Sequence, residues 1–194
     1  MPTAVQSDDD QALLRRFARG EVGALESLAG RYEGHLLGLA RALLRGNEAL
    51  ARDAVQETWL RVIRHAGNFA GKSSVKTWLY RITINRCHDL RQRVLQEGSV
   101  PHAQDADRGA ASVALTPAVA GAAEESMVRV RGAVDRLSED ARLVLLLCYH
   151  RGLTHEEAAG VMDVPVGTLK SRLHGALAKL RDVLPPDLAE EVRA

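Results

Sequence analysis

A cluster of polar and basic side chains near the C-terminal end of the chain has chemistry suited to DNA. The cluster consists of Thr168, Lys170, Ser171, Arg172 and His174. Leucines at positions 169, 173, 177, 180 and 184 recur at helical spacing and predict one apolar stripe, which leaves the cluster off the stripe. Residues 166–181 hold four Lys/Arg and no acid. This pattern favours a helix that enters the major groove; a hairpin with a solvated basic face is the alternative.

The residues before this helix predict how it is positioned. Thr154 and Glu157 have the spacing of a capping box, which starts a helix at about residue 155. Pro165 fixes its own φ and disfavours helix at Val164, so a tight turn is expected there before the basic helix begins. Two short helices around such a turn form a helix-turn-helix.

A second basic region lies in the N-terminal half of the chain. Residues 72–93 carry six Lys/Arg and one acid, Asp89. They follow a loop, residues 67–74, that is rich in Gly and Ser and contains one aromatic residue, Phe69. An aromatic side chain beside a basic helix can hold unstacked bases, whereas a core Phe and a solvated basic face explain the pattern equally well.

Polar side chains also share one face of a predicted helix at 48–65. Asp53, Gln56 and Glu57 are spaced i, i+3 and i+4, which places them together on the helix surface. A solvated face and a protein-binding patch are both consistent with this spacing.

The sequence holds no pattern of catalytic or cofactor-binding residues. Cys87, His88 and Asp89 are contiguous, so on a helix they point about 100° apart and cannot form a triad. No Cys/His spacing of a metal site and no glycine-rich nucleotide motif occurs. We therefore expect no enzymatic activity, no catalytic residue, no metal and no cofactor.

The remaining pattern predicts an all-α fold of two small domains joined by a flexible linker, the second domain being the helix-turn-helix domain. Apolar stripes at helical spacing predict helices at 10–19, 22–44, 48–65, 75–95, 126–137 and 138–151, besides the two at the turn. Residues 1–9 are expected to form a disordered tail that ends in a helix-start cluster of acids, and residues 185–194 a second tail. Residues 95–125 hold nine Ala and five acids without any apolar stripe, as a linker does.

Charge and hydropathy restrict the cellular setting. The formal net charge is +1, so any nucleic-acid surface must be local rather than global. No apolar run approaches the ~18 residues of a membrane span, and the N-terminus lacks a signal-peptide pattern. A cytoplasmic location is expected, with Cys87 and Cys148 as buried thiols.

Three stretches together resemble the extracytoplasmic-function (ECF) sigma factors, the minimal two-domain specificity subunits of bacterial RNA polymerase. Residues 53–60, DAVQETWL, are similar to the family's core-polymerase-binding helix. Residues 69–91 resemble the segment that melts and reads the minus-ten element, and residues 137–174 resemble the fourth region, which reads the minus-thirty-five element. The resemblance implies region 2 at 10–94 and region 4 at 126–184.

The resemblance also implies roles for individual residues and partners. Asp53, Gln56 and Glu57 would bind the polymerase clamp. Thr168, Lys170, Ser171 and His174 would face base edges of the minus-thirty-five element, with Arg172 nearer the phosphates. Contacts with the minus-ten region are implied for Asn68, Phe69, Lys72, Ser73, Ser74, Lys76, Arg81, Asn85, Arg86 and Arg91. The implied partners are core RNA polymerase, promoter DNA and an anti-sigma factor.

This sequence departs from the family pattern at several positions. Val75 replaces a common aromatic residue, and His174 and Gly175 replace larger or basic ones, so base preference cannot be transferred. Two other functions are consistent with parts of the chain: an autonomous helix-turn-helix regulator that uses residues 126–184 alone, and a helical scaffold without any nucleic-acid dependence.

Overall fold

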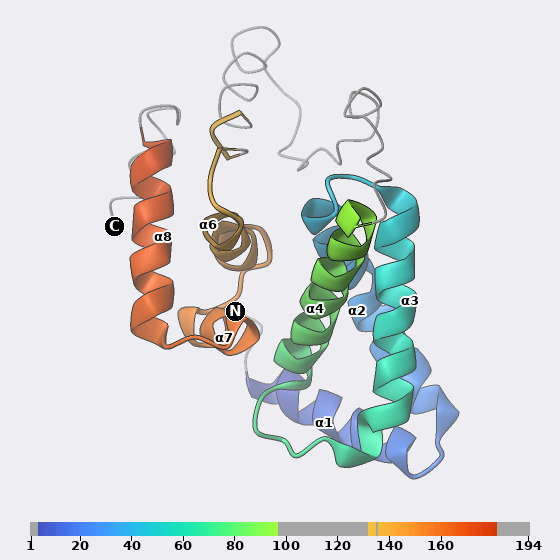
Figure 1. Cartoon of the computed structure of the whole chain (residues 1–194). Coiled ribbons are helices and arrows are strands. Elements are labelled where there is room, and N and C mark those ends of the chain that lie inside the picture. Colours follow the sequence, from blue (N-terminus) through green and yellow to red (C-terminus); the bar gives the residue numbers. More distant parts are fainter. Residues whose placement is uncertain (1–3, 97–131, 135, 182–194) are drawn as a thin grey trace, which may run out of the picture. The chain divides into compact units, whose positions relative to one another are not determined.

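The computed structural model describes residues 4–96, 132–134 and 136–181, and these residues are helical with short connections (Figure 1). The chain divides into two compact units, Met1–Ala111 and Ser112–Ala194. No strand occurs within the described ranges, which confirms the all-α prediction. Three predicted parts lie outside these ranges: the linker from residue 97 onward, residues 126–131 of the following helix, and the tail at 185–194. Among the helices described, none has the length and apolarity needed to cross a membrane.

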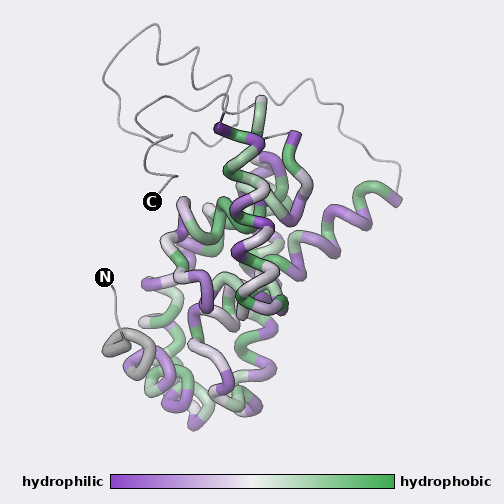
Figure 2. The backbone as a smooth tube through the Cα atoms, turned by 90° about the vertical axis from the view of Figure 1, so that its left-hand side faces the viewer, coloured by the Kyte–Doolittle hydropathy of each residue, from purple (hydrophilic) through white to green (hydrophobic). Residues whose placement is uncertain are grey.

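The first unit consists of four α-helices and one short 3₁₀ turn: α1 (Ala4–Ala18), α2 (Val22–Leu43), α3 (Glu48–His65), η1 (Ala66–Asn68) and α4 (Val75–Gln96). Helices α2, α3 and α4 pack against one another, and α1 lies across one end of them (Figure 1). Hydrophobic and hydrophilic residues alternate along each helix (Figure 2), so each buries one face. Leu28, Leu36 and Leu39 of α2 are fully buried in this core, as is Leu79 of α4.

Helix α1 begins earlier than the sequence predicts. It starts at Ala4 rather than at Asp10, so residues 4–9 are helical where a tail is expected. Asp10 therefore lies well inside the helix, where its carboxylate is buried and accepts hydrogen bonds from Arg31 (2.8 Å) and from the Tyr32 hydroxyl. Asp9 pairs with the same guanidinium at 2.6 Å. These acids hold α1 on α2 instead of capping a helix start.

The joint between α2 and α3 is held by an ion-pair cluster. Asn47 caps α3 by accepting a hydrogen bond from the Leu50 amide at 3.1 Å. Glu48 accepts hydrogen bonds from Arg41 at 2.6 and 2.7 Å and from Arg52 at 2.9 Å. The Arg41 hydrogen bonds in particular lower the pKa of Glu48 to about 2.

A buried hydroxyl pair links α3 to α4. The Thr58 and Thr83 Oγ1 atoms are 3.2 Å apart. Each oxygen also lies within hydrogen-bonding distance of a carbonyl one turn earlier in its own helix, Thr58 at 2.8 Å from Ala54 and Thr83 at 2.9 Å from Leu79. Each hydroxyl has one hydrogen, so one donates to its own carbonyl while the other donates across the pair. Both buried polar groups are thus satisfied, and the small side chains let the two helices approach closely.

The second unit contains α6 (Glu139–Leu145), a π-helical turn η2 (Leu146–His150), α7 (His155–Met162) and α8 (Val166–Leu180). Ser138 caps α6, accepting from the Ala141 amide at 3.4 Å, so this helix begins where the sequence predicts one, at 138–151. The segment 143–149 is only partly the buried hub that its apolar composition predicts. Val144 and Leu147 are fully buried, but Tyr149 lies 58% exposed in the π turn. The wider turn shifts the helical register, so the end of the segment leaves the core.

Candidate nucleic-acid interfaces

The helix-turn-helix geometry of the second unit is formed locally, as the sequence predicts. The Thr154 Oγ1 accepts from the Glu157 amide at 3.1 Å, and the Thr154 amide donates to the Glu157 carboxylate at 2.9 Å. Helix α7 ends at Met162, and the next residue, Asp163, adopts a left-handed conformation with φ of 57°. Pro165 then precedes the first residue of α8.

Helix α8 is held by one face and leaves the other face free. Leu169, Leu173, Ala176 and Leu180 are buried, and Leu177 is half-buried. The predicted base-reading side chains are all exposed: Thr168, Lys170, Ser171 and His174. The structure therefore leaves these four residues exposed across the solvent-facing half of a helix whose N-terminus follows a tight turn.

Arg172 differs from its neighbours on α8. It is half-buried, and its Nη1 lies 3.0 Å from the Oδ2 of Asp140 in the first turn of α6. In the free chain, the guanidinium expected near DNA phosphates is thus held in an ion pair within its own unit.

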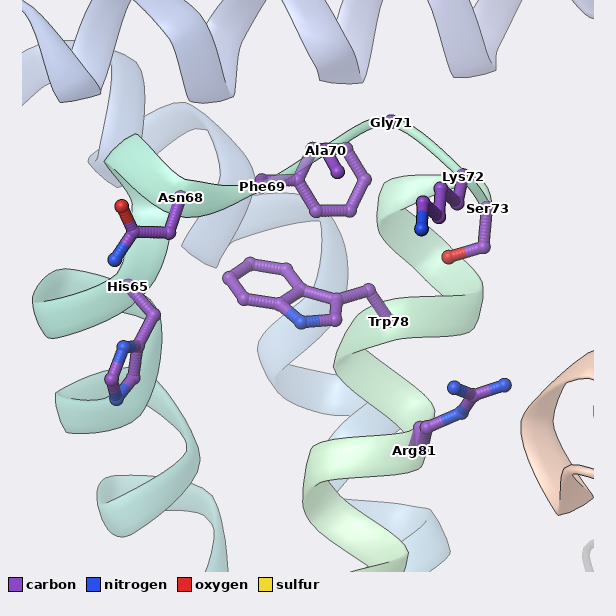
Figure 3. Close-up of a pocket in the computed structure, with 9 residues that line it drawn as sticks. All are labelled: His65, Asn68, Phe69, Ala70, Gly71, Lys72, Ser73, Trp78 and Arg81. Atoms are coloured by element: carbon purple, nitrogen blue, oxygen red, sulfur yellow. The ribbon is translucent and has the colours of Figure 1, made fainter.

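In the first unit, the loop after α3 forms a pocket lined by aromatic and polar side chains (Figure 3). The ring centroids of Phe69 and Trp78 are 5.0 Å apart, with the planes tilted by 47°. His65 and Asn68 lie on one side of these rings, and Lys72 lies on the other. The pocket has a volume of about 230 Å³ and opens to solvent.

Sequence reasoning missed two residues of this pocket, Trp78 and His65. Trp78 has the spacing of a core residue of α4, but its ring is only half-buried and contacts Phe69 instead. Val75, at the position where the family often has an aromatic residue, is buried at 1% exposure and does not line the pocket. The aromatic surface here thus comes from Phe69 and Trp78.

The other predicted loop residues have different environments. Lys72 and Asn68 are exposed, and Ser73 is half-buried. The Ser74 Oγ accepts from the Thr77 amide at 3.1 Å and so caps the start of α4. Ser74 is thereby committed to local structure, whereas Asn68, Lys72 and Ser73 line the pocket.

The basic residues of α4 do not all lie on its outer face. Asn85 is exposed, and Lys76, Arg81 and Arg91 are half-buried; Arg81 also lines the pocket. Arg86 contradicts the predicted outer position, because it is buried at 7% exposure and its Nη1 lies 2.9 Å from the Asp89 Oδ2. The reason is helical periodicity: residues 83, 84 and 87 belong to the buried face, and residue 86 falls within it.

On α3 the predicted polar face adjoins an apolar groove. Asp53 and Gln56 are exposed and Glu57 is half-buried. Farther along the same face, Leu60 and Ile63 are 37% and 49% exposed, although Ile63 has the spacing of a core residue. The groove has a volume of about 430 Å³ and is lined by Glu33, Leu37, Arg52, Val55, Gln56, Trp59, Leu60 and Ile63. The indole N–H of Trp59 is buried there without a hydrogen-bond partner.

The cysteines have the environments of structural thiols. Cys87 is buried, which raises the pKa of its thiol to about 12. Cys148 is half-buried, and burial raises its pKa as well. Within the part of the chain that the structure describes, no three His, Cys, Asp or Glu side chains gather as metal ligands would.

Comparison with known proteins identifies the class of both units. The model of Sigma-70 region 2 matches residues 28–94, and that of Sigma-70 region 4 matches residues 133–182. The RNA polymerase sigma-H factor of Pseudomonas aeruginosa is 34% identical over 190 residues, covering 94% of this chain and 97% of that protein. The ECF RNA polymerase sigma-E factor of Escherichia coli K12 is 30% identical over 186 residues, covering 91% and 95%.

Solved structures show the same architecture. The sigma factor RpoE of Bartonella quintana, solved with the anti-sigma factor NepR, has a TM-score of 0.59 and 26% identity, covering 82% of this chain and 95% of that one. CnrH, solved with the cytosolic domain of CnrY, has a TM-score of 0.65 over 90% of this chain and 96% of its own; at 24% identity it supports the fold alone.

The chain belongs to the ECF sigma factors of bacterial RNA polymerase. It is a transcription initiation factor rather than an enzyme, and it directs promoter-specific transcription. The resemblance inferred from the three sequence stretches is thereby confirmed.

Proposed function

We propose that the pocket of Phe69 and Trp78 captures an unstacked base of the minus-ten element when this sigma factor opens a promoter. The observation that carries the proposal is the pair of aromatic rings, 5.0 Å apart, in an open pocket of about 230 Å³. An aromatic face stabilises an unstacked base by about 1–3 kcal/mol in a sequence-tolerant way. Lys72 and Arg81 line the same pocket, where their charges attract the phosphate backbone.

The outer residues of α4 continue this basic surface. Lys76, Asn85 and Arg91 are proposed to lie along the promoter strands, as the family resemblance implies. Arg86 is not included, because its guanidinium is buried against Asp89. Ser73 stays within the proposed loop contact, whereas Ser74 contributes by capping α4.

The polymerase-binding surface is proposed to be the α3 face with its groove. Asp53, Gln56 and Glu57 supply the polar part, and Leu60 and Ile63 supply apolar area that the unit itself leaves exposed. A mixed patch of this kind is typical of protein interfaces, in which apolar anchors are surrounded by polar groups. Its position on the helix that resembles the family's core-binding segment supports the same partner, core RNA polymerase.

Helix α8 is proposed to read the minus-thirty-five duplex with Thr168, Lys170, Ser171 and His174, all of which are exposed on one side of the helix. We further propose a cytoplasmic location, because a sigma factor works with RNA polymerase on DNA. An anti-sigma factor is a proposed partner, since the similar sigma factor RpoE of Bartonella quintana was solved with the anti-sigma factor NepR.

The base-capture proposal is tested with two substitutions of one residue. Phe69→Leu keeps an apolar side chain but removes the π face, whereas Phe69→Tyr keeps the ring. Core polymerase is reconstituted with each variant on promoters selected from a random library by the wild-type chain. Open complexes are measured by permanganate reactivity of unpaired thymines. Losing one stacking contact predicts about a fivefold to hundredfold loss for Phe69→Leu and a near wild-type level for Phe69→Tyr.

Binding to core polymerase and to a closed minus-thirty-five duplex serves as the control in the same samples. Both are expected to stay unchanged for either variant. Wild-type opening by Phe69→Leu would refute base capture by this pocket. Sequence-specific duplex binding without core polymerase, together with no transcript when core polymerase is added, would instead favour an autonomous regulator, which the match of residues 28–94 to region 2 argues against.

A further inference from the structure

The pair between Asp140 and Arg172 sets one cation of the recognition helix apart from the others. Arg172 Nη1 lies 3.0 Å from Asp140 Oδ2, with side-chain exposures of 34% and 54%. Lys170, by contrast, is exposed on the same helix. Asp140 stands in the first turn of α6, whose N-terminal dipole favours its negative charge.

Helical geometry places Arg172 at the edge of the buried stripe. At about 100° per residue, it lies about 60° from Leu169 in the core and about 160° from His174 on the outer face. It nevertheless shares a flank with exposed Thr168, one turn earlier, so a released guanidinium would extend toward the DNA-facing end of α8. The guanidinium of Arg172 can therefore be neutralised either by Asp140 or by a DNA phosphate, and the ion pair favours Asp140.

We infer that Asp140 acts through Arg172 to limit the sequence-independent affinity of this domain for DNA, by holding the guanidinium away from the phosphate backbone. The inference rests on the proposed binding of α8 to the minus-thirty-five duplex. The pair is partly exposed, and such pairs add little to stability, so the leucine stripe rather than the ion pair holds α8 in place. Asp140 is a positioning residue for one side chain.

Two physical consequences distinguish this arrangement from a direct phosphate contact. A cation that neutralises a phosphate steepens the dependence of log K on log salt concentration by about 0.9. A cation already paired with Asp140 contributes nothing to that slope. Phosphate contacts also carry no sequence information, so releasing Arg172 tightens binding to specific and random duplexes alike.

The test measures salt dependence for the reconstituted holoenzyme on two fluorescent duplexes, one with a library-selected minus-thirty-five element and one with a scrambled element. Asp140→Asn should steepen the slope by about 0.9 and tighten binding to both duplexes about fivefold at 0.15 M salt, taking 1 M as the reference. Arg172→Gln should leave the slope unchanged in the wild-type background. In the Asp140→Asn background, the same change should remove the whole gain.

Glu156→Gln is the matched control, because Glu156 is an exposed acid in the first turn of α7, as Asp140 is in the first turn of α6. It should not change the slope, and an equal effect of Glu156→Gln and Asp140→Asn would overturn the inference. A shallower slope for Arg172→Gln alone would also overturn it, since Arg172 would then already contact phosphate. If wild-type holoenzyme does not distinguish the two duplexes, the proposed reading by α8 fails instead.

Discussion

Replacing Asp10 with alanine is expected to destabilise the first unit by about 2 kcal/mol. The Asp10 carboxylate is 2% exposed and accepts the hydroxyl hydrogen of buried Tyr32, besides pairing with Arg31 at 2.8 Å. Leaving the Tyr32 hydroxyl buried without an acceptor costs about 1–3 kcal/mol. The ion pair adds at most about 1 kcal/mol, since the Arg31 side chain is 34% exposed.

Asp9 provides an internal control, because it pairs with the same guanidinium at 2.6 Å but is 53% exposed. Asp9→Ala should therefore cost less than about 1 kcal/mol. Asp10→Asn keeps an acceptor for Tyr32 and loses only the charge, so its cost should fall between the two. The series separates the contribution of burial from that of charge.

Urea unfolding monitored by tryptophan fluorescence measures this series in the full-length chain. The only two tryptophans, Trp59 and Trp78, both belong to the first unit, so their emission reports on that unit alone. A loss of about 2 kcal/mol corresponds to a fall in the melting temperature of roughly 8–16 °C for a domain of this size. Equal losses for Asp10→Ala and Asp9→Ala would refute the reasoning, because burial would then make no difference.

Three further outcomes are expected. Gly175→Ala should stabilise the second unit by up to about 1 kcal/mol in circular-dichroism melts, because its new Cβ meets nothing within 4 Å in α8; a loss of stability would contradict this. Burial raises the pKa of Cys87 to about 12, so native Cys87 should resist iodoacetamide until the unit unfolds, while Cys148 should react first. Mass spectrometry of the digest measures the order of modification, and earlier modification of Cys87 would contradict this prediction. Partial desolvation, with the Arg151 charge, lowers the pKa of the exposed His150 side chain, so the unfolded state binds the proton more readily and the second unit should lose a little stability as pH drops through about 6.5; His150→Gln should weaken this dependence.

Local sequence chemistry predicts the helix boundaries of both units well. Thr154 and Glu157 interact with each other across one turn, and Ser138 and Asn47 each cap the helix that they precede. These interactions depend only on neighbours in the sequence, so spacing alone is sufficient to identify them. The start of α1 is missed for the opposite reason. Asp10 is held by Arg31 and Tyr32, which are distant in the sequence, so spacing within the helix does not reveal these contacts.

Periodicity identifies an apolar or polar face without showing what covers it. Arg86 has the composition of an outer residue, yet it falls between buried positions and pairs with Asp89. Trp78 has the spacing of a core residue, yet it packs on Phe69 at the rim of a pocket. In each case the tertiary arrangement of α3, α4 and the loop decides the environment, and that arrangement is not encoded in the pattern of a single helix.

Helix α3 shows why a surface for a protein partner is hard to identify from a sequence. Ile63 and Leu60 extend an apolar pattern that continues from the buried residues Val55 and Val62, so the pattern predicts a wider buried face. In the free chain, however, both side chains are exposed beside Gln56, because α2 and α4 cover only part of the helix. The centre of an interface that becomes buried on assembly is more apolar than the rest of the surface, and only the fold shows which apolar side chains the free chain leaves uncovered. The exposure of Leu60 and Ile63 beside the polar residues Asp53 and Gln56 therefore supports α3 as the polymerase-binding helix more directly than either sequence feature does alone.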